Sequence, residues 1–145
     1  MGTCQDMCAE FERVERTIQF DVKPEERGPD GSPDESRMVK KFRRAAAGLE
    51  EQLPSDLRPP PVLKQTCDYL FDTLIAEAPS LGSVEHFVWD RTRAVRNDFS
   101  IQQLSKAEDL RLAIHCLERI LRFHILTLHL CSVEPKPTEL YDAQQ

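Results

Sequence analysis

Long apolar runs and glycine-rich loops are both missing from this sequence, and each absence argues against a class of protein. The longest apolar run is short and interrupted by His and Thr, whereas a membrane-spanning helix needs about 20 apolar residues. The first residues are polar and acidic, unlike a secretory signal peptide. The chain has 5 glycines and contains no glycine-rich phosphate loop, no HExxH motif and no GxSxG motif. The sequence therefore favours neither a membrane protein nor an enzyme built on these motifs.

Charge and cysteine content indicate a soluble domain in a reducing compartment. Apolar residues make up 40% of the 145 residues, charged residues 30%, and the net charge is −6. A negative chain has no overall attraction for nucleic acid, although a local basic patch can still bind it. The five cysteines are an odd number without regular spacing, which is typical of cytosolic or nuclear proteins. For the Cys-x-x-x-Cys pair Cys4 and Cys8, packing or capping of a helix is favoured over zinc binding, and we expect no metal and no cofactor.

The stretch Leu104–Cys131 predicts the longest helix of the chain, because it contains neither Pro nor Gly. Ser105 and Glu108 have the spacing of a capping box at its start. A second apolar face beside the main one includes Cys116, Ile120 and Phe123. We expect this helix to be the spine against which the other helices bury their faces. Its main apolar stripe has helical spacing and consists of Leu110, Ile114, Leu117, Leu121, Ile125 and Leu128.

Two shorter helices are predicted near the N-terminus. In residues 6–20 an apolar stripe predicts a surface helix with one buried edge. Residues 22–35 carry prolines and glycines with little that is apolar, which predicts a mobile linker. Ser36 is placed to cap a helix over residues 37–47, and Gly48 to end it. The expected inward residues are Met7, Phe11, Val14 and Ile18 in the first helix and Met38, Val39, Phe42 and Ala46 in the second.

Two further helices are expected over residues 62–78 and 84–99, the second beginning after Ser83. Residues 138–145 have the composition of the first turns of another helix that the sequence cuts off. We therefore divide the chain into an N-terminal signature helix (1–21), a flexible linker (22–35), a helical-repeat region (36–131) and the start of a truncated following helix (132–145).

Basic residues gather in the second predicted helix. A solvated face is the favoured interpretation, and a patch for phosphate or an acidic partner is the alternative. The four residues are Lys40, Lys41, Arg43 and Arg44.

The helix over residues 84–99 carries two kinds of arginine. Arg91 lies within an apolar stripe, so we expect it to be buried and paired with a carboxylate or with helix-end carbonyls, in a structural role. Trp89, Arg93 and Arg96 share another face. This group fits a stacking platform for single-stranded nucleic acid, an anchor of a protein interface, or a core Trp beside solvated arginines. The sequence leaves these three alternatives open.

No convergent polar cluster points to catalysis, because the four histidines are scattered over two helices and helical spacing turns Cys116 inward. We therefore predict a scaffold and not an enzyme.

Several sequence blocks together span nearly the whole chain. They are GTCQDMC (2–8), ER (12–13), VKKFRRAAA (39–47), LPSDLRPPPVLKQTCDYL (53–70), FVWDRTRAVRNDFSIQQ (87–103) and ERILRFHIL (118–126). In this order they resemble the GANP family of nuclear mRNA-export scaffolds, whose yeast member is the suppressor-of-actin export protein, also called a leucine permease transcriptional regulator. Ala9 departs from the family pattern, in which Pro usually follows the second Cys. The linker over residues 21–35 is also not typical of the family.

This resemblance implies an all-α, TPR-like superhelix that forms the N-terminal part of a PCI-type domain, with the winged helix outside these residues. It also implies a scaffold in the transcription-and-export complex two, located in the nucleus and at the nuclear pore. The partners it implies are a second PCI-domain subunit, a small acidic Sem-type protein, RNA and, through other regions, the mRNA-export receptor and the pore. A paralogous PCI scaffold linked to elongation or splicing is the near alternative, and a direct RNA-binding module is another. No membrane association is implied.

Overall fold

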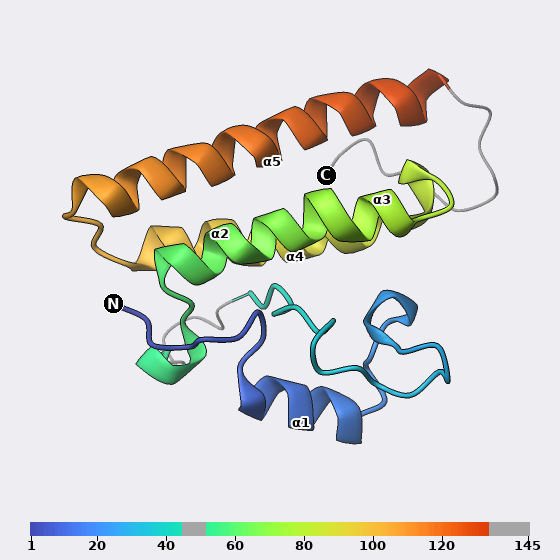
Figure 1. The fold of residues 1–145 in the computed structure, drawn as a ribbon, viewed down its shortest axis with the longest axis horizontal. Helices are drawn as coiled ribbons and strands as arrows, with labels where there is room; N and C mark the ends of the chain where they lie inside the picture. The colour runs from blue at the N-terminus through green and yellow to red at the C-terminus, as the bar shows by residue number, and fades with distance from the viewer. Residues whose placement is uncertain (45–51, 134–145) are drawn as a thin grey trace.

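In the computed structural model, which describes residues 1–44 and 52–133, the chain is all-α as the sequence predicted (Figure 1). No strand occurs in these two ranges, and the sole β feature there is an isolated bridge between Arg27 and Pro33. No helix of the described part is long and apolar enough to cross a membrane. The helices are α1 (Glu10–Ile18), α2 (Pro60–Asp68), α3 (Ile75–Glu77), α4 (Leu81–Ile101) and α5 (Ala107–Val133), with a π-helical segment η3 (Tyr69–Leu74) and two 3-10 turns, η1 (Pro24–Glu26) and η2 (Pro54–Asp56).

Proline and serine mark the helix boundaries in the middle of the chain. Pro60 begins α2, where its missing N–H costs no helical hydrogen bond. The helix runs on through η3 and α3 and ends at Ala78, before Pro79. Ser80 caps α4, because its hydroxyl accepts a hydrogen bond from the Ser83 amide at 3.3 Å. Both helices that the sequence predicted in this region are present.

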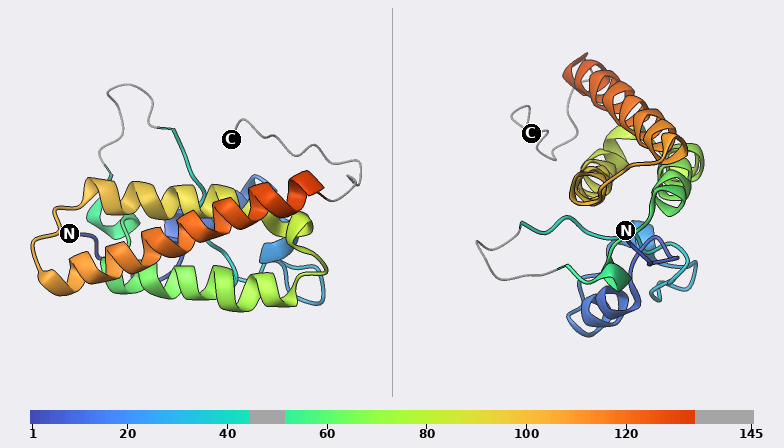
Figure 2. Two further views of the ribbon diagram at one scale, coloured as in Figure 1. Left: turned by 90° about the horizontal axis from the view of Figure 1, so that it is seen from above. Right: turned by 90° about the vertical axis from the view of Figure 1, so that its left-hand side faces the viewer.

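Three layers of chain form the molecule. The continuous α2–η3–α3 helix lies beside α4, and α5 crosses both of them on one side (Figure 2). The segment that contains α1 and residues 20–44 lies on the opposite side. Two apolar clusters fill the helical layers, and their buried members are Val39, Leu70, Leu74, Val84, Phe87, Val88 and Phe123 in one and Leu63, Cys67, Val95, Phe99, Ala113, Cys116 and Ile120 in the other.

The face of α5 that is buried differs from the one expected. The stripe from Leu110 to Leu128 faces outward, and its members Ile114 and Leu121 are 58% and 59% exposed. The buried residues come instead from the second apolar face. Ala113 and Cys116 on that face are small, so α5 can approach α2 and α4 closely. The sequence predicted this helix over residues 104–131, and the structure has it over Ala107–Val133, beginning two residues after Ser105. The face predicted to be buried was wrong.

Helix α1 also turns the opposite way from the prediction. Phe11, Val14 and Ile18 are 72%, 52% and 70% exposed, while Glu12 and Arg16 of the same helix are buried. The charged face is inward because the layer beneath α1 offers ionic partners instead of an apolar surface, as described below.

Residues 22–44 differ from both expectations for this region. The segment expected to be a linker contains the fully buried Glu26 and the buried Val22. Where a helix was predicted, Arg37 lies in a turn and residues 38–44 form an extended segment without regular secondary structure. Carboxylates bind the backbone amides of residues 39, 41 and 42, so these amides are not available for a helix. Residues 45–47 of that predicted helix, and residues 134–145 of the truncated one, lie outside the described residues.

Candidate functional site

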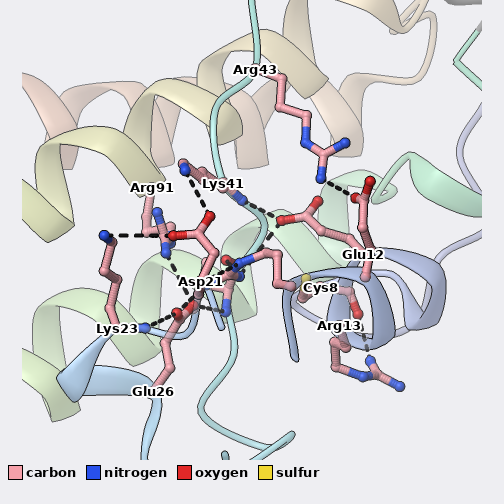
Figure 3. A network of polar contacts seen from close by, with 12 residues as sticks. Cys8, Glu12, Arg13, Asp21, Lys23, Glu26, Lys41, Arg43 and Arg91 are labelled. Atoms are coloured by element: carbon pink, nitrogen blue, oxygen red, sulfur yellow. Dashed lines mark hydrogen bonds and ion pairs between the residues drawn. The ribbon is translucent and has the colours of Figure 1, made fainter. Parts of the chain in front are cut away.

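A buried ionic network centred on Glu26 joins α1, η1 and α4 (Figure 3). One carboxylate oxygen of Glu26 pairs with Arg16, and the other lies 3.2 Å from Nη2 of Arg91. Arg91 also pairs with Asp90, and Arg16 lies 3.7 Å from Glu12. Glu26, Arg16 and Arg91 are all at most 2% exposed, and three carboxylates face two guanidinium groups. Both buried guanidinium groups thus have carboxylate partners, which avoids the large cost of an unpaired buried charge.

The same carboxylates hold the extended segment of residues 38–42 in place. The Val39 amide donates to Glu26 at 3.1 Å, the Lys41 amide to Glu12 at 2.8 Å and the Phe42 amide to Asp90 at 3.3 Å. The Val39 carbonyl accepts a hydrogen bond from Arg16. Side chains thus bind three amides of this segment, and the Lys40 amide donates to the Met7 carbonyl at 3.0 Å.

A second buried cluster is centred on Asp98 of α4. Its two oxygens accept hydrogen bonds from Arg58 Nε and Lys40 Nζ, both at 2.8 Å. Gln102, one turn further along, donates to the Arg58 carbonyl and accepts from the Gly2 amide at 2.9 Å. This cluster ties the N-terminal residues and the loop before α2 to one end of α4.

Three of the four basic residues 40, 41, 43 and 44 have ionic partners within the chain. Lys40 is bound to Asp98, Lys41 lies 2.9 Å from Asp21, and Arg43 pairs with Glu15. The Lys41 contact also lowers the pKa of Asp21 below its ordinary value. Arg44 is exposed. The geometry does not assemble these four residues into one free basic patch.

Arg93 and Trp89, which the sequence placed on one face of α4, do lie together. The Arg93 guanidinium is 4.0 Å from the centre of the Phe42 ring and 5.4 Å from that of Trp89. Arg96 is exposed one turn further along, and its pKa is lowered by partial burial and by the charge of Arg93. A groove of about 390 Å³ begins at Phe42 and runs between residues 40–43 and the C-terminal half of α4.

Arg91, expected to be buried and paired, is 2% exposed and contacts Glu26 and Asp90. Sequence reasoning missed the rest of both networks. Asp98 carries the same signal as Arg91, because it lies seven residues further along the buried face of α4. For Glu26 no such signal exists, since the surrounding composition indicates a linker.

Four cysteines, Cys4, Cys8, Cys67 and Cys116, are buried packing residues in the described part of the chain. Burial raises the pKa of Cys8 to about 12, and Cys4 donates a hydrogen bond to the Asp6 carbonyl. Cys67 and Cys116 contact each other between α2 and α5, and this contact and burial raise the pKa of Cys67. The raised pKa values make Cys8 and Cys67 poor nucleophiles, whereas the hydrogen bond with Cys67 lowers the pKa of Cys116. Within residues 1–44 and 52–133 no three His, Cys, Asp or Glu side chains converge as a metal site.

Comparisons with known proteins identify the family of this chain. A profile of the SAC3/GANP family matches residues 7–145. SAC3 family protein 1 of Schizosaccharomyces pombe is 46% identical over 130 residues, which are 89% of this chain and 12% of that protein. SAC3 family protein B of Arabidopsis thaliana is 36% identical over 89% of the chain and 7% of that protein. Protein xmas of Drosophila melanogaster is 37% identical over 86% of the chain and 6% of that protein.

The chain therefore spans a small part of the length of these relatives. The profile covers nearly all of its residues, and the match includes the ionic networks and α4. This chain belongs to the SAC3/GANP family.

Proposed function

We propose that this chain is a structural part of a scaffold subunit that acts in nuclear mRNA export. Membership of the SAC3/GANP family over residues 7–145 is the observation that carries the proposal, because it points to a scaffold role related to mRNA export. The buried carboxylates and basic side chains of the two networks agree with this role, since they bind one another and the backbone. Such groups hold layers of chain in a fixed arrangement, which is what a scaffold requires.

The outward face of α5 is the surface that best fits a protein partner. It presents leucine and isoleucine side chains over a helix of 27 residues, or about 40 Å. Its spacing of three and four residues is the pattern by which one helix packs along another. The partners in this proposal are a second PCI-domain subunit and a small acidic Sem-type protein, and the site of action is the nucleus and the nuclear pore.

Co-purification of this chain with the second PCI-domain subunit tests the proposal. We expect the wild-type chain to retain that subunit and the double variant Ile114→Glu/Leu121→Glu to lose it. Both residues are more than half exposed, so the variant should remain folded. Val14→Glu/Ile18→Glu, which places the same charges on the exposed face of α1, is the matched control. Failure of the wild-type chain to bind the subunit would contradict the proposed partner.

A further inference from the structure

Arg93 lies over two aromatic rings, whereas Arg91 and Arg119 each lie over one. Its planar guanidinium is held between Phe42, from the extended segment, and Trp89, from α4 (distances above). A guanidinium that contacts rings through its faces keeps the N–H donors of its edge available to an anion. His86 extends the aromatic surface, because its ring centre lies 6.0 Å from that of Trp89.

The positive charge of this face is not neutralised within the described residues. Arg93 and Arg96 have no ion-pair partner there, and the neighbouring carboxylates Glu15 and Glu26 pair with Arg43 and Arg91. The nearby carboxylate of Asp90 is already bound to Arg91 and to the Phe42 amide. Glu85 is partly buried, and burial raises the pKa of its carboxyl group. Within the described residues, the charges of Arg93 and Arg96 are therefore available to an anionic ligand.

We propose that Arg93 and Arg96, with Trp89 and Phe42, bind single-stranded nucleic acid. The guanidinium edges contact phosphate oxygens, and the exposed part of the Trp89–His86 surface stacks on unpaired bases. The groove beside Phe42 gives the strand a path along α4 toward Ile101, with Lys41 and Arg43 on its wall. The choice of RNA over DNA rests on the proposed export function, whereas the geometry requires an unpaired strand.

An acidic protein segment is the competing ligand, and the aromatic residues argue against it. A carboxylate-rich peptide needs the arginines alone, whereas bases gain from stacking on an aromatic side chain. The proposed site lies on α4, and the surface proposed for the protein partner lies on α5. Loss of one activity therefore leaves the other measurable.

Fluorescence anisotropy of labelled single strands of about 12 nucleotides, oligouridine and oligothymidine, tests the site on the whole chain. We expect affinity to fall with salt, and Arg93→Gln/Arg96→Gln to weaken binding at least tenfold at low salt. Two lost phosphate contacts should also reduce the salt slope by about 1.4. Trp89→Leu keeps the charge and should weaken binding roughly tenfold. Tighter binding of oligouridine than of oligothymidine would support RNA as the ligand, and the reverse would assign the site to DNA.

Arg111→Gln/Arg122→Gln is the matched control, since it removes the same charge from α5 and should leave the affinity within about twofold. Because Arg96 is exposed, the single variant Arg96→Gln should remain folded and still weaken binding, and circular dichroism of each variant checks the fold.

Equal binding by the α4 and control double variants would overturn the proposal, as would absence of binding by the wild-type chain. Displacement of RNA by polyglutamate, together with no effect of Trp89→Leu, would assign the site to an acidic protein. Failure of the chain to retain the second PCI-domain subunit would contradict the partner proposal and leave this one standing.

Discussion

At the scale of single residues, Glu26 joins several segments of the chain although nothing in the sequence predicts that it is buried. It is fully buried, and its two oxygens bind Arg16 of α1, Arg91 of α4 and the amides of Lys23 and Val39. One carboxylate thus joins four segments of the chain. Removing a partner from such a group leaves the remaining charges buried without compensation.

Glu26→Gln should therefore be strongly destabilising although it keeps the shape of the side chain. We expect the free energy of unfolding, measured by urea denaturation, to fall by about 3–5 kcal/mol. Glu77→Gln is the control, because it breaks the more exposed pair with Arg37 and should cost less than about 1 kcal/mol. Similar losses in the two variants would show that Glu26 is not the centre of the network.

His124 should make stability depend on pH near neutrality. Burial and the charge of Arg96 lower the pKa of His124 in the folded chain, so unfolding lets it take up a proton at its ordinary pKa of about 6.5. Its contribution to stability is present above that pH and is lost as the pH falls. We expect His124→Gln to show a smaller loss of unfolding free energy than wild type between about pH 7 and about pH 5. His129→Gln should keep the wild-type dependence, and an unchanged slope in His124→Gln would contradict the prediction.

At the scale of elements, α1 and α5 show that an apolar stripe need not face the core. Each helix has two faces that can be buried, and the neighbouring layer selects one of them. For α1 the neighbours are carboxylates and guanidinium groups, so Glu12 and Arg16 turn inward. For α5 the narrow space between α2 and α4 takes the face with Ala113 and Cys116. The helix periodicity could be predicted from the sequence, and the buried face could not.

Substitutions on the two faces of α5 should separate them by stability. Ile120 is 2% exposed, and we expect Ile120→Ala to lower the free energy of unfolding by about 2–5 kcal/mol. Leu121→Gln, one residue along on the outward face, should change it by less than about 0.5 kcal/mol. Chemical denaturation of both variants gives the comparison. A large loss in Leu121→Gln would mean that the outward stripe is already covered in this chain.

At the scale of the whole molecule, the N-terminal residues connect distant parts of the chain. The Thr3 and Cys4 amides donate to the carbonyls of Pro54 and Leu57, and the Gly2 amide donates to Gln102. Gly2 packs so closely that an added Cβ would lie 2.1 Å from the Leu57 carbonyl oxygen. The N-terminus, the loop before α2 and the end of α4 therefore form one unit.

Gly2→Ala tests this close contact. Because the obstructing atom belongs to the backbone, we expect a loss of about 1–3 kcal/mol in the free energy of unfolding. In Gly82→Ala the new methyl group meets open space in the first turn of α4. That control should be neutral or stabilising by up to about 1 kcal/mol. Thermal and urea unfolding of both variants measure the difference, and equal effects would argue against the packing of the N-terminal residues described here.

Contacts between residues close in the sequence could be predicted, and contacts between distant segments could not. The α4 group of Trp89, Arg93 and Arg96 was predicted because helical spacing alone brings residues three and four apart together. Phe42 could not be added to it from the sequence, since an apparent helix over residues 37–47 gave no reason to place an extended Phe beside Arg93. The same is true of Lys40 and Lys41, which are bound by Asp98 and Asp21 from distant segments.

By itself the sequence determined the all-α class, the existence of α1, α2, α4 and α5, the buried position of Arg91 and the resemblance to its family. These features depend on helical periodicity, on capping residues and prolines, and on short sequence motifs. Each of these signals lies within a short stretch of the sequence. The tertiary structure alone decided which face of each helix is buried, and that residues 22–44 are held by side chains instead of forming a linker and a helix. Those outcomes depend on ionic and packing partners that are far apart in the sequence. Leaving a buried charge unpaired costs more free energy than exposing a leucine, so the ionic partners decide which face is buried.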